Sequence, residues 1–204
     1  RFRDDAGTAD RLAVATGRGV LVRAGKEPAG FAPKAPCLRV EDGFLRSRGL
    51  GAELVPPLSL VTDGLGIYYD PTRPSRLEGL IAQPLTEGQR GRAMVLIARL
   101  KAAGLSKYNL GGAVPALPPG HRILVPGQVE DDASIRLGAG GVRTNLGLLQ
   151  AVRAANPGAV ILYKPHPDVE AGLRPGAVDA TGLADLTLSR VDPVALLAEV
   201  QEVW

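Results

Sequence analysis

Short apolar runs alternate with helical patterns along this chain, and this alternation limits the folds open to it. The predicted strands are residues 19–22, 37–40, 58–61, 67–69, 123–125, 159–163 and the start of another at 202–204. Runs this apolar suit strands that are buried on both faces of a sheet. Strands that alternate with helices favour an α/β fold with mostly parallel strands, and from residue 120 onward the pattern indicates an open Rossmann-like sheet.

Four helices are indicated by their first residues and by the spacing of apolar side chains. Ser75 with Glu78, and Thr86 with Gln89, have the spacing of capping boxes. The helix after Thr86 is expected to bury one face, made of Ala93, Leu96, Ile97 and Leu100. A third helix begins near Thr144 and a fourth at Asp192-Pro193. Their expected inward residues are Leu146, Leu149 and Val152 in the third, and Leu196, Leu197 and Val200 in the fourth.

A Gly/Pro-rich stretch near residues 110–120 divides the chain. We predict an amino-terminal α/β lobe over residues 1–84, a helix and linker over 85–119, and a partial Rossmann-like lobe over 120–204. The chain begins at Arg1 rather than Met and ends at Trp204 directly after an apolar pattern. We therefore expect an excised fragment whose second lobe is incomplete, and the uncovered strand edge favours self-association.

Composition excludes several classes of protein. The longest apolar stretches fall short of the roughly 18 to 20 residues that a membrane-spanning helix needs. A single cysteine, Cys37, cannot form an intrachain disulfide, and two histidines are few for structural zinc. The net charge of +3 comes with only 4% aromatic residues. This gives no stacking platform for bases, so we expect no nucleic acid partner, whereas an anionic small ligand fits the charge.

Three polar segments directly follow predicted strands, where open α/β sheets bind ligands. They are residues 41–47, 126–134 and 164–168. Glu41-Asp42 and Asp131-Asp132 also suit helix caps or solvated loop charges. His166 is held between two prolines, which fix the backbone and present the imidazole rigidly, and Lys164 adds a cation suited to phosphate or carboxylate. The alternative is that His166 is a satisfied turn histidine.

Standard nucleotide motifs are missing from the sequence. It has no G-x-x-x-x-G-K-[ST] pattern, and Gly138-Ala139-Gly140-Gly141 lacks dinucleotide-fingerprint spacing. A metal-dependent hydrolase built on His166, Asp168 and the acidic pairs is conceivable, but His121 precedes a strand and no H-x-x-x-H or H-x-H pair exists.

Several long motifs occur in the order found in one bacterial family. They are Glu41-Asp42-Gly43-Phe44-Leu45-Arg46-Ser47 with Gly49-Leu50-Gly51, then residues 56–61, 66–70 and 74–78, then 125–135 and 163–169. Over residues 18–204 the chain resembles the capsule polysaccharide biosynthesis family of β-Kdo glycosyltransferases, of the KpsC type. Members of this family carry two tandem modules. The sequence of residues 128–132 is more similar to the carboxyl-terminal module than to the amino-terminal one.

The resemblance implies a two-lobed, GT-B-like transferase. It would move the acidic eight-carbon sugar Kdo from CMP-Kdo to a Kdo- or phosphatidylglycerol-linked lipid acceptor, building the linker of a Gram-negative capsule. The implied location is cytoplasmic and peripheral to the inner membrane, with the second module of the parent chain as a partner. No cofactor or metal is implied beyond the donor substrate. Relatives continue past the position of Trp204, so donor binding by the fragment is expected to be impaired.

The resemblance also assigns roles to residues of this chain. Asp132 matches the last aspartate of the family's Q-V-x-x-D pattern and is the expected nucleophile, with Glu130 and Asp131 as competitors. Glu41 is the expected base for the acceptor hydroxyl. The expected substrate-binding residues are Arg46, Ser47, Gln128, Glu130, Lys164 and His166. Two other readings stay open: a non-catalytic scaffold or acceptor-binding lobe, and a metal-dependent phosphoryl or ester hydrolase.

Overall fold

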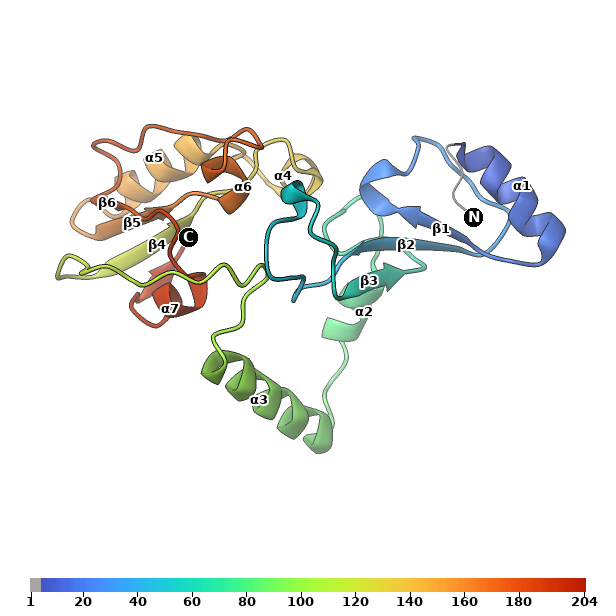
Figure 1. The fold of residues 1–204 in the computed structure, drawn as a ribbon, viewed down its shortest axis with the longest axis horizontal. Coiled ribbons are helices and arrows are strands. Elements are labelled where there is room, and N and C mark those ends of the chain that lie inside the picture. The colour runs from blue at the N-terminus through green and yellow to red at the C-terminus, as the bar shows by residue number, and fades with distance from the viewer. Residues whose placement is uncertain (1–4) are drawn as a thin grey trace. The chain divides into compact units, whose positions relative to one another are not determined.

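The computed structural model describes residues 5–204, which form two compact units (Figure 1). The first unit consists of the described residues up to Arg46 together with Pro57–Leu85, and the second consists of Ser47–Pro56 and Thr86–Trp204. The units therefore interleave in sequence. Of the helix and linker expected at residues 85–119, all but Leu85 belong to the second unit. None of the helices in residues 5–204 is long and apolar enough to cross a membrane.

The first unit contains a three-stranded sheet in the order β1-β2-β3. Its elements are α1 (Ala6–Thr16), β1 (Val20–Arg23), β2 (Cys37–Asp42), β3 (Leu60–Asp63) and α2 (Arg76–Ile81). β1 pairs with β2 in parallel, but β3 runs antiparallel to β2. The sequence patterns do not indicate α1, which begins at its cap Asp5 and ends at Gly17 with φ of 62°. The capping box at Ser75 is confirmed.

The prediction of a strand at residues 67–69 is wrong, because that segment is a turn. Asp63 accepts hydrogen bonds from the backbone N–H groups of Leu65 at 2.7 Å and Gly66 at 3.1 Å. These bonds turn the chain directly after β3 and occupy backbone donors that a further strand would need. Ile67 is buried in the turn, and the ring of Tyr68 packs against Phe44 with centroids 5.1 Å apart.

The second unit contains a four-stranded sheet in the order β6-β5-β4-β7, and all its strands are parallel. Its elements are α3 (Glu87–Ala102), β4 (Arg122–Pro126), α4 (Ala133–Gly138), α5 (Asn145–Ala155), β5 (Val160–Lys164), α6 (Pro167–Glu170), β6 (Leu186–Thr187), α7 (Pro193–Leu197) and β7 (Glu202–Val203). The predicted α/β class is confirmed by this sheet and by the sheet of the first unit. The strands at 123–125 and 159–163 are confirmed within one residue, whereas β6 lacks a pattern that would predict it.

Both faces of this sheet are covered, with α5 on one face and α7 on the other (Figure 1). Ile123 and Ile161 contribute to the core beneath α5 together with Leu149. Their strand neighbours Leu124 and Leu162 point to the opposite face, because side chains alternate along a strand. This two-sided burial explains why these strands are almost entirely apolar.

Three expected buried faces differ from the structure. α3 keeps its capping box at Thr86 but buries none of its residues. Its apolar residues 94–97 are consecutive and so surround the helix, which gives it no single apolar face. In α5 the buried residues are Asn145, Leu149 and Val152, while Leu146 is exposed. In α7 Leu196 is fully buried, but Leu197 is exposed. Consecutive residues of a helix point in different directions, so Leu197 cannot face the sheet together with Leu196.

Candidate functional site

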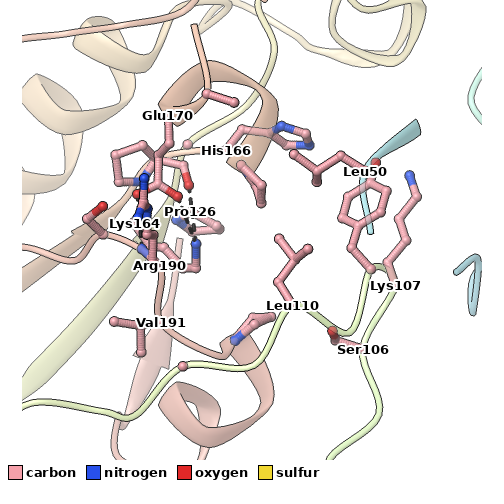
Figure 2. Close-up of a pocket in the computed structure, with 18 of the residues that line it drawn as sticks. Leu50, Ser106, Lys107, Leu110, Pro126, Lys164, His166, Glu170, Arg190 and Val191 are labelled. Atoms are coloured by element: carbon pink, nitrogen blue, oxygen red, sulfur yellow. Dashed lines mark hydrogen bonds and ion pairs between the residues drawn. The ribbon is translucent and has the colours of Figure 1, made fainter. Parts of the chain in front are cut away.

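A pocket of about 590 Å³ opens at the carboxyl ends of β4 and β5 in the second unit (Figure 2). This is the edge at which open parallel sheets bind ligands. Its polar lining includes Ser106, Lys107, Tyr108, Gln128, Lys164, His166, Glu170 and Arg190. Its apolar lining includes Leu50, Leu110 and Val191. The pocket therefore offers cations and an apolar wall in the same space.

Lys164, the last residue of β5, brings a buried positive charge to the pocket. Its side chain is only 8% exposed, and Nζ lies 3.7 Å from Glu170 Oε2. Nζ also donates to the Pro165 carbonyl at a long 3.4 Å. Glu170 accepts in addition from the backbone N–H of Arg190 at 3.2 Å. Because the contacts of the ammonium are long, it keeps the capacity to bind an oxyanion in the pocket.

His166 is held in one orientation and one tautomer. It caps α6, and its Nδ1 accepts a hydrogen bond from the backbone N–H of Asp168 at 3.1 Å. The proton of the neutral ring is therefore on Nε2. Tyr108 packs edge-on against the ring with centroids 6.1 Å apart. Burial lowers the pKa of His166, and the charges of Lys107 and Lys164 lower it further against the opposing effect of Asp168. The ring is thus a neutral Nε2–H donor near pH 7.

Asp132 begins α4 and is ionised. Its Oδ1 accepts from the backbone N–H of Ser134 at 2.9 Å and from the Ser134 hydroxyl at 2.7 Å. Within residues 5–204 no hydrogen bond reaches Oδ2. Burial raises the pKa of Asp132, but the Ser134 hydrogen bonds and the charges of Arg174 and Lys107 outweigh it, so the pKa is lowered. One carboxylate oxygen is anchored and the other is available for chemistry.

The remaining acidic residues of this loop are engaged with the protein. Asp131 forms an ion pair with Arg174 at 2.6 Å. Glu130 Oε1 accepts from the backbone N–H of Asn145 at 2.8 Å. Gln128 is exposed at the pocket, where its Nε2 donates to the Pro126 carbonyl at 3.3 Å.

Ser47 contacts the segment that carries Lys107 rather than the pocket itself. It is buried, its hydroxyl donates to the Gly49 carbonyl at 2.8 Å, and its backbone N–H donates to the Lys107 carbonyl at 3.2 Å. Asn109 Nδ2 donates to the Ser47 carbonyl at 2.9 Å. These bonds fix the backbone next to Lys107 and Tyr108.

Two predicted site residues lie in the first unit. Glu41, in β2, accepts at Oε1 from the Gly25 N–H at 3.3 Å and from the Tyr69 hydroxyl at 3.2 Å. Its Oε2 lies 3.5 Å from Arg23 Nη2. Arg46 is buried, and its Nε donates to Asp42 Oδ2 at 2.5 Å.

A family model places the chain among known proteins. The model described as capsule polysaccharide biosynthesis protein matches residues 23–110 and 115–199. The chain belongs to this family. The family predicted from the sequence motifs is thereby confirmed.

Relatives with this family's motifs are considerably longer than the chain. It is 47% identical over 174 residues to the capsule polysaccharide modification protein LipA of Neisseria meningitidis serogroup A. This alignment covers 82% of the chain and 25% of LipA. It is 51% identical over 146 residues to the lipopolysaccharide-processing protein LpsZ of Rhizobium meliloti, which covers 68% of the chain and 33% of LpsZ. The chain thus spans a quarter to a third of the length of these relatives.

Two solved structures of the capsule family share the fold. KpsC β Kdo 2,4 transferase of Thermosulfurimonas dismutans is 33% identical, with a TM-score of 0.76 over 100% of this chain and 60% of that chain. KpsC β Kdo 2,7 transferase of the same organism is also 33% identical, with a TM-score of 0.74 over 98% of this chain and 62% of that one. The GT-B-like fold class holds at this coarse level.

In this member of the capsule family, the pocket brings together three of the residues expected to bind substrate: Gln128, Lys164 and His166. Ser47, Glu130 and Asp132 belong to the same unit but do not line the pocket, and Glu41 and Arg46 belong to the other unit. The roles assigned to these eight residues remain predictions. Within residues 5–204, no three His, Cys, Asp or Glu side chains gather in the manner of a metal site.

Other lining residues of the pocket were missed by sequence reasoning. Lys107 and Tyr108 lie in the short polar and aromatic segment between α3 and the Gly/Pro-rich stretch, and the Lys107 ammonium lies 5.2 Å from the Tyr108 ring. Arg190, with φ of 51°, follows β6 at the same sheet edge. The rule that ligands bind at the ends of strands would have found Arg190 had β6 been recognised.

Proposed function

We propose that this chain is a β-Kdo glycosyltransferase module that transfers Kdo from CMP-Kdo to a Kdo- or phosphatidylglycerol-linked lipid in capsule linker synthesis. The observation that carries the proposal is the cationic pocket at the sheet edge of a chain that matches two β-Kdo transferases over its length. In this proposal the protein works on the cytoplasmic face of the inner membrane, beside a second transferase module. It needs no resident metal or cofactor.

The pocket suits the nucleotide part of such a donor. Lys164 supplies a buried positive charge, and the Nε2–H of His166 supplies a directed hydrogen bond, which together match a phosphate that gains charge as the sugar departs. Leu50, Leu110 and Val191 offer an apolar surface for the nucleoside. Lys107 and Arg190 also line the pocket. With Lys164 they give it three cationic side chains against the two carboxylates of Glu53 and Glu170, which favours an anionic donor.

The proposed chemistry follows from the stereochemistry of the donor. CMP-Kdo is a β-configured donor, so a β-linked product requires net retention and therefore two displacements. Asp132 Oδ2 attacks the anomeric carbon, the bond to the phosphate oxygen breaks, and CMP leaves with the electron pair. The acceptor hydroxyl then gives its proton to Glu41 and attacks the same carbon, which releases Asp132.

The other predicted residues orient the sugar in this scheme. Arg46 is the proposed partner of the Kdo carboxylate, since a guanidinium binds a carboxylate with two hydrogen bonds. Gln128 is the proposed hydrogen-bond donor to the sugar hydroxyls. Ser47, whose hydroxyl proton is donated to the Gly49 carbonyl, is proposed to contact the sugar as an acceptor. Glu130 is proposed to contact the substrate from the same loop, beside its bond to the Asn145 N–H.

Transfer to a synthetic Kdo-terminated lipid, with CMP-Kdo as donor, tests the proposal. Asp132→Asn is expected to lower the transfer rate by about a thousandfold or more, because the amide is not a nucleophile. The matched control is Asp131→Asn, next to it in sequence but paired with Arg174, which should keep most of the activity. If the parent protein of this module does not transfer Kdo, or if its Asp132→Asn variant keeps the wild-type rate, the proposal is contradicted.

The covalent step has a separate readout. Glu41→Gln slows the second displacement, so intact-protein mass spectrometry under turnover should find one added Kdo, located on Asp132 after proteolysis. If turnover continues and the adduct never accumulates in this slow variant, the two-step mechanism loses its support.

A further inference from the structure

The side chain of Asn145 holds the loop that follows β4. Asn145 is the first residue of α5 and is only 3% exposed. Its Oδ1 accepts from the backbone N–H of Gln128 at 2.8 Å, and its Nδ2 donates to the Gln128 carbonyl at 2.8 Å. The carboxamide thus bonds to both the N–H and the carbonyl of Gln128, as a residue of a neighbouring strand would.

The same residue makes two further hydrogen bonds. Nδ2 donates to the Gly176 carbonyl at 2.7 Å, and the backbone N–H of Asn145 donates to Glu130 Oε1 at 2.8 Å. The Glu130 N–H in turn donates to the Pro175 carbonyl at 3.3 Å. A carboxamide has one acceptor oxygen and two donor hydrogens, and here all of them are used within the protein. Aspartate lacks the donors, and alanine lacks all three groups.

The packing around this amide leaves no spare space. Gly176 has a φ of 129°, and a Cβ on it would lie 2.7 Å from the Gln128 oxygen and 2.9 Å from Asn145 Nδ2. The carbonyl that Asn145 binds is therefore at close range only because residue 176 is glycine. Two segments distant in sequence meet at this one side chain.

The loop fixed by Asn145 forms one wall of the candidate pocket. Gly127 and Gln128 line the pocket, and the loop runs on to Asp132, where α4 begins. We propose that Asn145 is the positioning residue of this wall: it sets the backbone of Gln128 and the carboxylate of Glu130. The wall's role in binding nucleotide rests on the proposed function, whereas the placement of the loop does not.

The test uses the full chain and CMP as the probe. Asn145→Asp replaces the two donors by an oxygen that faces two carbonyls, and it is expected to weaken CMP binding in calorimetry by about tenfold or more. The matched control is Asn156→Asp at the other end of α5, whose Nδ2 donates to the Val152 carbonyl at 3.1 Å. This control also removes an amide donor from the helix, and it should leave CMP affinity within about twofold of wild type.

A second measurement follows the loop without any ligand. Amide hydrogen exchange of Gln128 should be at least about tenfold faster in Asn145→Ala than in Asn156→Ala, because only the first change removes the oxygen that accepts from the Gln128 N–H. Asn145→Ser tests the same loss without a new charge beside Glu130. Gly176→Ala, which changes no hydrogen-bonding group, should speed up the same amide by pushing the loop away.

The outcomes separate the two proposals. Unchanged CMP affinity in folded Asn145→Asp together with an unchanged Gln128 exchange rate in folded Asn145→Ala overturns the role of Asn145. If wild-type protein does not bind CMP, Gln128 exchange decides alone: faster exchange in Asn145→Ala supports positioning by Asn145 and an unchanged rate overturns it. If Asn145→Asp does not fold, Asn145→Ser and Gly176→Ala are judged by the same two measurements.

Discussion

The imidazole of His166 shows how neighbouring groups define a single residue's chemistry. The Asp168 N–H occupies Nδ1, so only Nε2–H is left to meet a ligand. Burial, together with Lys107 and Lys164, makes a further positive charge unfavourable at this place, while Asp168 and Asp132 act in the opposite direction. The cationic corner expected from Lys164 and His166 is thus one permanent cation and one neutral donor. This pairing stabilises a phosphate without requiring an acidic pH.

The lowered pKa of His166 predicts how stability depends on pH. As the pH falls below the ordinary histidine value of about 6.5, the unfolded chain binds a proton that the folded chain resists, so folding is penalised. Above that value the penalty is absent. The free energy of unfolding of wild type minus that of His166→Gln should therefore fall between pH 7.5 and pH 5.5.

Urea denaturation of both proteins at a series of pH values checks this prediction. The titration of the carboxylates cancels in the difference, because these groups are common to both proteins. A difference that is constant over the range, or that rises toward acid pH, contradicts a neutral buried His166.

At the scale of the element, sequence patterns predicted the helices and strands whose formation depends on residues close together in the chain. The capping boxes at Ser75 and Thr86 were predictable because their bonds span three residues. β4 and β5 were predictable because two-sided burial makes a strand continuously apolar. Residues 67–69 have the same apolar and aromatic character, but the hydrogen bonds that the Asp63 carboxylate accepts from the Leu65 and Gly66 N–H groups turn the chain before a strand can form.

Some residues of the candidate site were likewise predictable from sequence patterns, and others were not. Lys164, His166 and Gln128 were predictable because each follows a recognisable strand at the ligand edge. Lys107 and Arg190 reach the pocket from segments without a periodic pattern, so only the tertiary fold reveals them. Asn145 has a signal that was overlooked: it is the first member of the buried stripe 145, 149, 152, and a polar residue on such a stripe needs buried partners.

The exposure of α3 predicts that its apolar residues contribute little to stability in this chain. Leu96 and Ile97 are 53% and 57% exposed. Leu96→Gln and Ile97→Gln should each change the free energy of unfolding by no more than about 0.5 kcal/mol, since glutamine is also a good helix former. Leu149→Ala, at a fully buried position of α5, should cost about 2 to 5 kcal/mol. Chemical denaturation that finds a cost of about 2 kcal/mol or more for Leu96→Gln would show that α3 is packed.

At the scale of the whole molecule, the two units differ in what holds them together. The largest fully buried side chains of residues 5–204 all belong to the second unit, among them Tyr163, Ile123 and Leu149. The buried cluster of the first unit is small and consists of Ala13, Val20 and Ala35. Large buried apolar side chains contribute most to stability, so the first unit has the weaker hydrophobic core.

The first unit also contains a buried ionic group. Glu27 accepts from Arg39 at 2.6 and 2.7 Å, and it also forms an ion pair with Arg73 at 3.2 Å. Burial raises the pKa of Glu27, but the two arginines outweigh it and the pKa is lowered. Such a group adds specificity more than net stability, because removing the charges from water costs about as much as their attraction returns.

These differences predict that the first unit opens at a lower free energy than the second. Native-state hydrogen exchange compares the central strands of the two sheets, β2 and β5, each paired on both sides. Amides of β2 should exchange through an opening that costs less than the opening of β5 by about 2 kcal/mol or more, since each large buried side chain contributes about that much. Val40 and Leu162 are suitable reporters at equivalent central positions. Equal opening free energies for the two strands would mean that the chain unfolds as one cooperative body and that the small core of the first unit does not limit its stability.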